Sequence, residues 1–163
     1  MTVAIRVATA DEVPILNAIR TSVRENHMSL EQMAAYGITP EVIARVITTT
    51  GRGFIAGVDG IDAAIAIAEA EAGCIYAMFV LPDYEGMGLG RLLMTEAERF
   101  LYEAGCDNVW LEAGATEELR AHGFYAHLGW RRDGLMPDGQ LRFVKSRDEL
   151  ARGTAQLKDL ASG

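Results

Sequence analysis

Three apolar runs follow one another closely in the middle of the chain, and they limit the folds that it can adopt. The runs cover residues 53–58, 63–70 and 74–81. The connections between them contain Asp59-Gly60 and Glu71-Ala72-Gly73. Short apolar runs joined by glycine-containing turns are typical of β-hairpins. The sequence therefore predicts three consecutive antiparallel strands at the centre of the protein.

Helical patterns precede these three strands. Residues 3–7 have the pattern of a short strand, and Asp11 is a candidate N-cap of a helix whose apolar face continues to Val23. Two further helices are expected to begin at Ser29 and Thr39, where polar capping residues precede apolar positions at helical spacing. The chain is therefore expected to begin with one strand followed by helices.

Helix and strand patterns alternate after the three strands. Apolar residues at helical spacing predict an amphipathic helix over residues 90–104, which Gly105 ends. The later segments are a strand at 108–112, a helix at 116–128, strands at 130–133 and 140–145, and a polar tail or short helix at 147–163. An antiparallel meander followed by a strand–helix–strand crossover predicts an α/β fold, with a mixed, mostly antiparallel central sheet and helices on both faces.

Composition is that of a globular domain and disfavours several classes of function. The 163 residues fit a single domain, 1–163, and half of them are apolar. The net charge of −8 disfavours nucleic acid as a partner. No apolar stretch approaches the roughly 20 residues that cross a bilayer, and the N-terminus has no secretory pattern. Because Cys74 and Cys106 are expected to be reduced, we expect a cytoplasmic protein that does not associate with membranes.

Three glycines at every second position lie between the third central strand and the helix that follows it. Gly86, Gly88 and Gly90 allow successive backbone N–H groups to face one concavity without obstruction by side chains. These donors would lie at the positive end of the helix dipole, which favours a phosphate or pyrophosphate. The spacing differs from G-x-G-x-x-G, and Arg91-Leu92 replaces the Gly-Lys-Ser/Thr ending of nucleotide triphosphatases. We call residues 86–91 the candidate anion cradle.

The anion cradle and a second motif together resemble the GNAT superfamily of N-acetyltransferases. The family's acetyl-CoA loop, R/Q-x-x-G-x-G/A after a strand that ends in V-x-P, is matched by residues 80–82 and 85–90. The second signature, A-x-x-x-Y-x-x-x-G-F/W, is matched by Ala121, Tyr125, Gly129 and Trp130. Both motifs fall at the expected separation, with a helix and a strand between them.

The chain departs from the family pattern at two positions. Glu85 stands where the family usually has Arg or Gln, so a carboxylate is expected near the pyrophosphate and would weaken cofactor affinity unless it points outward. The Asn often found before the second motif is missing, and Glu118 occupies that region. Glu85 keeps open the alternative of a non-catalytic acyl-CoA-binding or regulatory module of the same fold. A nucleotide-binding α/β domain is a third hypothesis.

The resemblance implies direct transfer of an acetyl group from acetyl-CoA to an amine. Backbone groups of Met78, Phe79 and Val80 are expected to pair with the pantetheine arm as a substitute strand. The resemblance also implies an oxyanion near a strand amide around Phe79, at a β-bulge. The amides expected to bind the pyrophosphate are those of Gly86, Met87, Gly88, Leu89, Gly90 and Arg91.

Two protons must move in such a reaction. Tyr125 is the expected acid, because a phenol stays protonated at neutral pH and can protonate the leaving thiolate. The base is left open between Glu112, Glu69, Glu71, Tyr76 and a water chain. Of the nearby histidines, only His122 shares the helical face of Tyr125, and His27 lies in the expected substrate rim.

The expected acceptor is a primary amine of a small molecule or peptide, whose identity the sequence does not specify. The acidic net charge mildly favours a cationic substrate. No grouping of His, Cys, Asp or Glu has metal-ligand spacing, so we expect no metal. Dimers are common in the family that the chain resembles, which makes a homodimer one further expectation.

Overall fold

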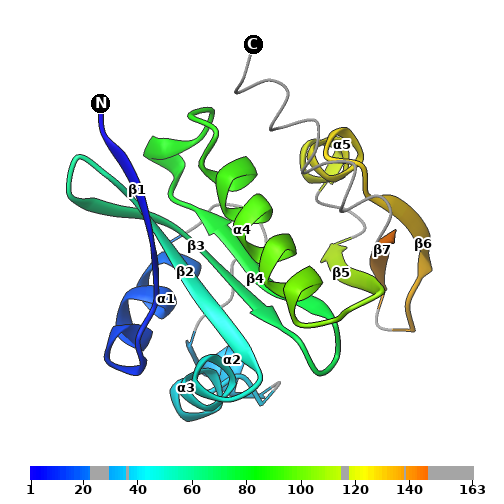
Figure 1. The fold of residues 1–163 in the computed structure, drawn as a ribbon, viewed down its shortest axis with the longest axis horizontal. Coiled ribbons are helices and arrows are strands. Elements are labelled where there is room, and N and C mark those ends of the chain that lie inside the picture. Colours follow the sequence, from blue (N-terminus) through cyan, green and yellow to red (C-terminus); the bar gives the residue numbers. More distant parts are fainter. Residues whose placement is uncertain (23–29, 36, 115–117, 138, 147–163) are drawn as a thin grey trace.

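The computed structural model describes residues 1–22, 30–35, 37–114, 118–137 and 139–146, and these form one seven-stranded sheet with helices packed against it (Figure 1). The strand order is β1-β2-β3-β4-β5-β7-β6, and every neighbouring pair is antiparallel except β4 and β5. The strands are β1 (Val3–Val7), β2 (Gly51–Val58), β3 (Ile61–Glu69), β4 (Cys74–Val80), β5 (Asn108–Gly114), β6 (Arg131–Leu135) and β7 (Gln140–Ser146). The helices are α1 (Val13–Arg20), α2 (Leu30–Ala35), α3 (Pro40–Thr48), α4 (Leu89–Glu103) and α5 (Glu118–His127). The predicted mixed, mostly antiparallel sheet is confirmed.

Turn residues with positive φ close the central meander. Asp59 has φ 50° and Gly60 has φ 85°, so both residues between β2 and β3 occupy the left-handed region that a tight hairpin needs. Gly73, with φ 74°, ends the turn between β3 and β4. Both predicted hairpins are therefore confirmed, and the expected tail at 147–163 lies outside the described residues.

Helices cover both faces of the sheet, each with its own apolar core. Ala64, Ala66 and Ala68 line one face of β3 with no exposed surface, and their small size admits α4 with its fully buried Leu93 and Leu101. On the other face, isoleucines of β2 and β3 pack against Leu16 of α1 and Ile43 of α3, along with others. Figure 1 shows α4 crossing one face, with α1, α2 and α3 grouped together away from it. Helices on both faces, as predicted, are confirmed.

The first helix begins differently from the prediction. A 3-10 turn at Ala10–Glu12 precedes α1, and Thr9 rather than Asp11 caps it. The Thr9 amide donates to Glu12 Oε1 at 3.1 Å, and Arg6 holds the same carboxylate through a 2.7 Å contact to Oε2. The Asp11 prediction was wrong because the capping box Thr9–Glu12 supplies a stronger start. The predicted start at Thr39 is confirmed, since Thr39 Oγ1 accepts the amide of Val42 at 3.2 Å.

Candidate active site

The sheet opens between its two parallel strands, β4 and β5. Only Cys74 of β4 and Trp110 of β5 are paired there among the described residues. The Trp110 amide donates to the carbonyl of Gly73 at 3.0 Å, next to that pair. Beyond it, β4 continues along β3 as far as Val80, while β5 continues along β7. The edge of β4 after Cys74 therefore faces a gap in the sheet instead of a strand.

The register of β3 and β4 decides which backbone groups of β4 face this gap. Leu81 donates its amide to the carbonyl of Ala63 at 2.8 Å, and Ile65 stands opposite Phe79 in the same register. In an antiparallel ladder, hydrogen-bonded pairs alternate with unbonded ones. Phe79 is therefore bonded to β3, and Met78 and Val80 direct their N–H and C=O groups toward the gap. Of the three residues expected to pair with a pantetheine arm, two present backbone groups to the opening.

A β-bulge lies at the start of this gap. The register passes from Ile67–Ala77 to Ala68–Ile75, so Tyr76 is the extra residue of β4. Tyr76 and Ala77 consequently both pack on the face that α1 and α3 cover. A bulge bends its strand and increases its twist, which moves β4 away from β5 immediately after their single pair. The bulge expected around Phe79 lies three residues earlier, because the bend is needed where the two strands part.

The anion cradle follows β4 through a 3-10 turn, Pro82–Tyr84. Gly86 has φ 78° and Gly88, the N-cap of α4, has φ 83°. The first bond of the helix runs from the Leu92 amide to the Gly88 carbonyl at 3.1 Å, so the amides of residues 89–91 are not used inside α4. A glycine at the N-cap offers no side chain to bind them, and no atom of the described structure lies within 4 Å of a Cβ built at Gly86 or Gly88. The arrangement presents an unobstructed set of backbone donors.

The side chains of the cradle are divided between core and surface. Leu89 is buried and Met87 packs against the same core, so these residues contribute only their amides to the outer side. Arg91 and Glu85 are exposed. Gly90 has a packing role as well, because a Cβ there would lie 3.2 Å from Phe124 Cζ of α5. This contact places α5 beside the N-terminus of α4.

Tyr125 lies on α5 within the core that α4 and the sheet share. Its ring centroid is 5.5 Å from that of Phe124 and 5.3 Å from that of Phe143 of β7. Burial raises the pKa of the Tyr125 phenol, so the group is protonated at neutral pH. Its hydroxyl forms no hydrogen bond within the described part of the chain. The side chain of His122 and the whole of His27 lie outside the described residues.

A buried polar network, which was not predicted from the sequence, fixes α5 against α4. Lys145 of β7 is 4% exposed, and its Nζ donates to both carboxylate oxygens of Glu98, at 3.1 and 3.2 Å, and to the Leu128 carbonyl at 2.8 Å. Trp130 Nε1 donates to the same carboxylate at 2.9 Å. The network joins α4, β7 and the end of α5, and so holds the helix that carries Tyr125. A lysine within the apolar pattern of residues 141–145 was the one available signal.

The predicted bases are in different surroundings. Glu112 stands opposite Arg142 on β7 and forms an ion pair with it at 3.3 Å, and Arg142 also lies 4.3 Å above the Trp110 ring. Glu69 accepts the amides of Glu71 and Ala72 at 2.9 and 2.7 Å, so it closes the turn at the joined end of β4 and β5. Of the four residues, Glu112 and Tyr76 belong to the parts of β5 and β4 that border the gap.

Sequence reasoning overlooked Arg20, the last residue of α1. Its guanidinium carbon lies 4.8 Å from the centroid of the Phe79 ring, on the face of β4 that α1 covers. Basic residues at the C-terminus of a helix are usually solvated and favoured by the helix dipole, so the pattern gave no reason to select this one. Tyr76, Phe79 and Arg20 therefore lie on the face of β4 that α1 covers, opposite the face where Tyr125 packs.

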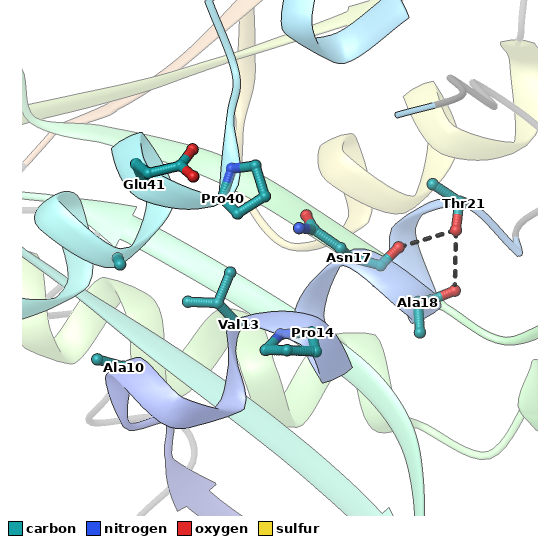
Figure 2. A pocket seen from close by; sticks show the side chains of 9 residues that line it. Ala10, Val13, Pro14, Asn17, Ala18, Thr21, Pro40 and Glu41 are labelled. Atoms are coloured by element: carbon teal, nitrogen blue, oxygen red, sulfur yellow. Dashed lines mark hydrogen bonds between the residues drawn. The ribbon is translucent and has the colours of Figure 1, made fainter. Parts of the chain in front are cut away.

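A separate groove of about 620 Å³ lies between α1 and α3 (Figure 2). Val13 and Asn17 line it from α1, and Pro40 and Glu41 from α3, with apolar surface predominating. Figure 2 shows the Asn17 carboxamide directed toward Pro40, and its buried Oδ1 has no hydrogen-bond partner among the described residues. No residue of the anion cradle and no candidate base lines this groove, so it is distinct from the opening between β4 and β5.

Two further features are absent from the described residues. No three His, Cys, Asp or Glu side chains there are grouped as ligands of a metal ion. No described helix has the length and apolar character to span a membrane.

Solved structures of acetyltransferases share this fold. The PaiA N-acetyltransferase of Thermoplasma acidophilum, solved with coenzyme A, is 15% identical, with a TM-score of 0.75 over 90% of this chain and 99% of that one. The ribosomal-protein-S18-alanine N-acetyltransferase of Escherichia coli is 21% identical, with a TM-score of 0.68 over 88% of this chain and 91% of that one. A GNAT-family acetyltransferase of Staphylococcus aureus is 14% identical, with a TM-score of 0.74 over 90% of this chain and 99% of that one.

The sequence itself carries the same assignment. No curated protein matches it significantly. The model of the acetyltransferase (GNAT) family matches residues 30–130, which is more than half of the chain and includes the gap, the anion cradle and Tyr125. The chain therefore belongs to the acetyltransferase (GNAT) family.

Proposed function

We propose that residues 1–163 form a single-domain N-acetyltransferase, which transfers an acetyl group from acetyl-CoA to the primary amine of a small molecule or peptide. One observation carries the proposal: β4 presents the backbone groups of Met78 and Val80 to a gap in the sheet, beside the uncapped N-terminus of α4. An edge strand and an anion cradle at adjacent positions match the two ends of a phosphorylated thioester.

In the proposed complex, backbone groups hold the co-substrate. The amides of residues 86–91 bind its pyrophosphate, where the helix dipole and the free donors favour negative charge. Its pantetheine arm lies along β4 and exchanges hydrogen bonds with Met78 and Val80, as an added strand would. Glu85 is exposed, where solvent screens its charge, so the carboxylate that stands here in place of the family's Arg or Gln does not exclude the anion.

The reaction requires the amine nitrogen to attack the thioester carbonyl. A new C–N bond forms, the carbonyl oxygen becomes an oxyanion, and the C–S bond then breaks as the carbonyl returns. An outward-facing amide of β4, from Met78 or Val80, is the candidate donor to the oxyanion. One such donor typically lowers the barrier by about 3–4 kcal/mol.

Two side chains on opposite sides of the gap are assigned the proton transfers. Tyr125 gives its phenolic proton to the leaving thiolate, a role that its protonated state at neutral pH suits. Glu112 is our candidate for the group that receives the proton of the attacking amine, directly or through water. The ion pair with Arg142 holds that carboxylate in place along β5. Tyr76 and a water chain are the alternatives for this second role.

A panel of amines with detection of free thiol tests the activity. We expect acetyl-CoA to stabilise the protein by about 2.7 kcal/mol at 100 times its dissociation constant. We also expect at least one amine among amino acids, polyamines, aminoglycosides and peptides to raise thiol release. Stabilisation without thiol release from any amine would instead support a non-catalytic acyl-CoA-binding module. Stabilisation by ATP or NAD alone would contradict both.

Removing the hydroxyl of Tyr125 separates its chemical role from its packing role. Tyr125→Phe keeps the ring between Phe124 and Phe143, so the free energy of unfolding should change little. Turnover should fall by about 100-fold, the lower end of what a general acid contributes. Acetyl-CoA affinity, measured by calorimetry, should stay nearly the same. Equal losses of turnover and affinity would show that Tyr125 has only a structural role.

A further inference from the structure

Arg20 carries a positive charge that no described group neutralises. Its Nε is buried and has no hydrogen-bond partner among the described residues, and it forms no ion pair within that part of the chain. Among the described residues, the phenol of Tyr76 is the ionisable group that acts on its charge. Burial is the largest influence on the pKa of Arg20 and lowers it, while Tyr76 raises it. An arginine keeps its charge nonetheless, because its ordinary pKa lies far above neutral.

A partly buried arginine without a charged partner costs folding free energy. Charged groups that leave water are normally paired or bonded to a polar partner. The Phe79 ring below the guanidinium offers a cation–π contact at 4.8 Å, which satisfies none of its N–H donors. Within the described residues, Nε of Arg20 therefore remains available to an anion that comes from outside the chain.

The other arginine beside the gap makes a useful comparison. Arg142 also lies over an aromatic ring, that of Trp110, but Glu112 neutralises its charge at 3.3 Å. Both arginines have an unpartnered buried Nε, yet only Arg20 lacks a carboxylate partner in the described structure. The uncompensated positive charge at the gap is thus located at the end of α1.

Arg20 lies close to the part of β4 that is proposed to hold the thioester. Phe79 lies between Met78 and Val80, the two residues that direct backbone groups into the gap. Its ring extends to the α1 face of the sheet, opposite the face where Tyr125 packs. Arg20 therefore lies over the side of the gap that is left for the acceptor when the thiolate and its acid occupy the other side.

We propose that the acceptor is a small amine that carries a carboxylate close to its amino group, and that Arg20 binds this carboxylate. The planar guanidinium matches a carboxylate with two parallel hydrogen bonds, so it would orient the amine as well as attract it. The inference rests on the proposed acetyl transfer and narrows its substrate class to amino acids and their close analogues. The acidic net charge of the whole chain does not oppose it, because distant carboxylates are screened over about 8 Å.

Matched pairs of amines test this proposal directly. Each pair consists of an amino acid and its carboxamide, so that only the negative charge differs. Thiol release is measured for both members with the wild-type chain, Arg20→Gln and Arg20→Lys. We expect the wild type to prefer the acid of at least one pair. Arg20→Gln should lower kcat/KM for that acid by about 10- to 100-fold, the loss typical of a hydrogen bond to a charged group, and should change the amide little.

The temperature of thermal unfolding is a second measurement, and it would change differently if Arg20 had only a structural role. Because Arg20 has no ion pair to lose within the described part of the chain, Arg20→Gln should unfold at the same temperature as the wild type or higher. Arg20→Lys should retain part of the acid preference, since it keeps the charge but loses the two-bond geometry. Arg52→Gln is the control, because Arg52 lies 4.7 Å above the Phe100 ring and belongs to no part of the site. The control should leave the acid preference unchanged.

The outcomes distinguish this inference from the activity on which it rests. If amides and acids react equally with the wild type and with Arg20→Gln, the acetyltransferase stands and the carboxylate role is wrong. A lower unfolding temperature, with equal loss on acid and amide, would assign Arg20 a purely structural role. If no amine releases thiol, both proposals fail together. A preference for acidic peptides over free amino acids would overturn the small-molecule class.

Discussion

Gly88→Val is expected to abolish acetyl-CoA binding. Gly88 is the N-cap of α4 at φ 83°, and the space around its missing Cβ is open. A branched side chain there would stand in front of the free amides of residues 89–91 and occupy the position proposed for the pyrophosphate. We expect affinity, measured by calorimetry, to fall by more than 100-fold, which corresponds to a loss of more than about 2.7 kcal/mol.

The same helix supplies a matched control at its other end. Gly105 follows α4 at φ 94°, and it too has no atom within 4 Å of a built Cβ. Gly105→Val therefore carries the same kind of backbone strain, about 1–3 kcal/mol, without touching the anion cradle. It should lose stability but keep acetyl-CoA affinity. If Gly88→Val bound the thioester as well as Gly105→Val does, the pyrophosphate would have to lie elsewhere.

The second large effect is expected in the network below α5. Glu98→Ala should lower the free energy of unfolding by about 3–5 kcal/mol, because it leaves the Lys145 ammonium buried without its counterion. Lys145→Met should be costly for the converse reason, since burial already raises the pKa of the Glu98 carboxyl and the charge of Lys145 opposes that rise. Chemical denaturation measures both variants.

A double variant tests whether Glu98 and Lys145 stabilise the protein as a pair. Glu98→Leu with Lys145→Met removes both charges and fills the space with apolar side chains, so it should be much less destabilising than the sum of the single changes. Arg99→Met provides the exposed comparison, because its ion pair with Glu96 at 3.0 Å lies at the surface and should contribute less than about 1 kcal/mol. Additive losses in the double variant would show that Glu98 and Lys145 do not act as a pair.

Most of the sheet could be predicted from local signals. Glycines at positive φ mark the hairpin ends, and apolar runs bounded by them gave β2, β3 and β4 to within a few residues. The bulge at Tyr76 could not be predicted, because residues 74–81 form an unbroken apolar run on both faces. Alternation therefore carries no information there, and only the paired register shows the extra residue.

The candidate site also has a part that the sequence predicts and a part that it does not. The glycine spacing predicted an anion cradle without any knowledge of the fold, since it needs only adjacent backbone donors at a helix start. The direction of the β4 amides depends on which pairs of β3 and β4 are hydrogen-bonded, which one strand alone does not determine. Arg20 and the Glu98–Lys145 pair depend on tertiary burial, because neither residue type nor spacing distinguishes a buried charge from a solvated one.

The single pair that joins β4 to β5 in the described structure has a mechanical consequence. It leaves the sheet as two blocks, β1–β4 and β5–β7, that share almost no backbone bonding. Cohesion between the blocks depends on side chains, including the ion pair of Glu98 on α4 with Lys145 on β7. A molecule that lies in the opening and bonds to β4 would bridge the blocks itself, so occupancy and rigidity of the whole protein would rise together.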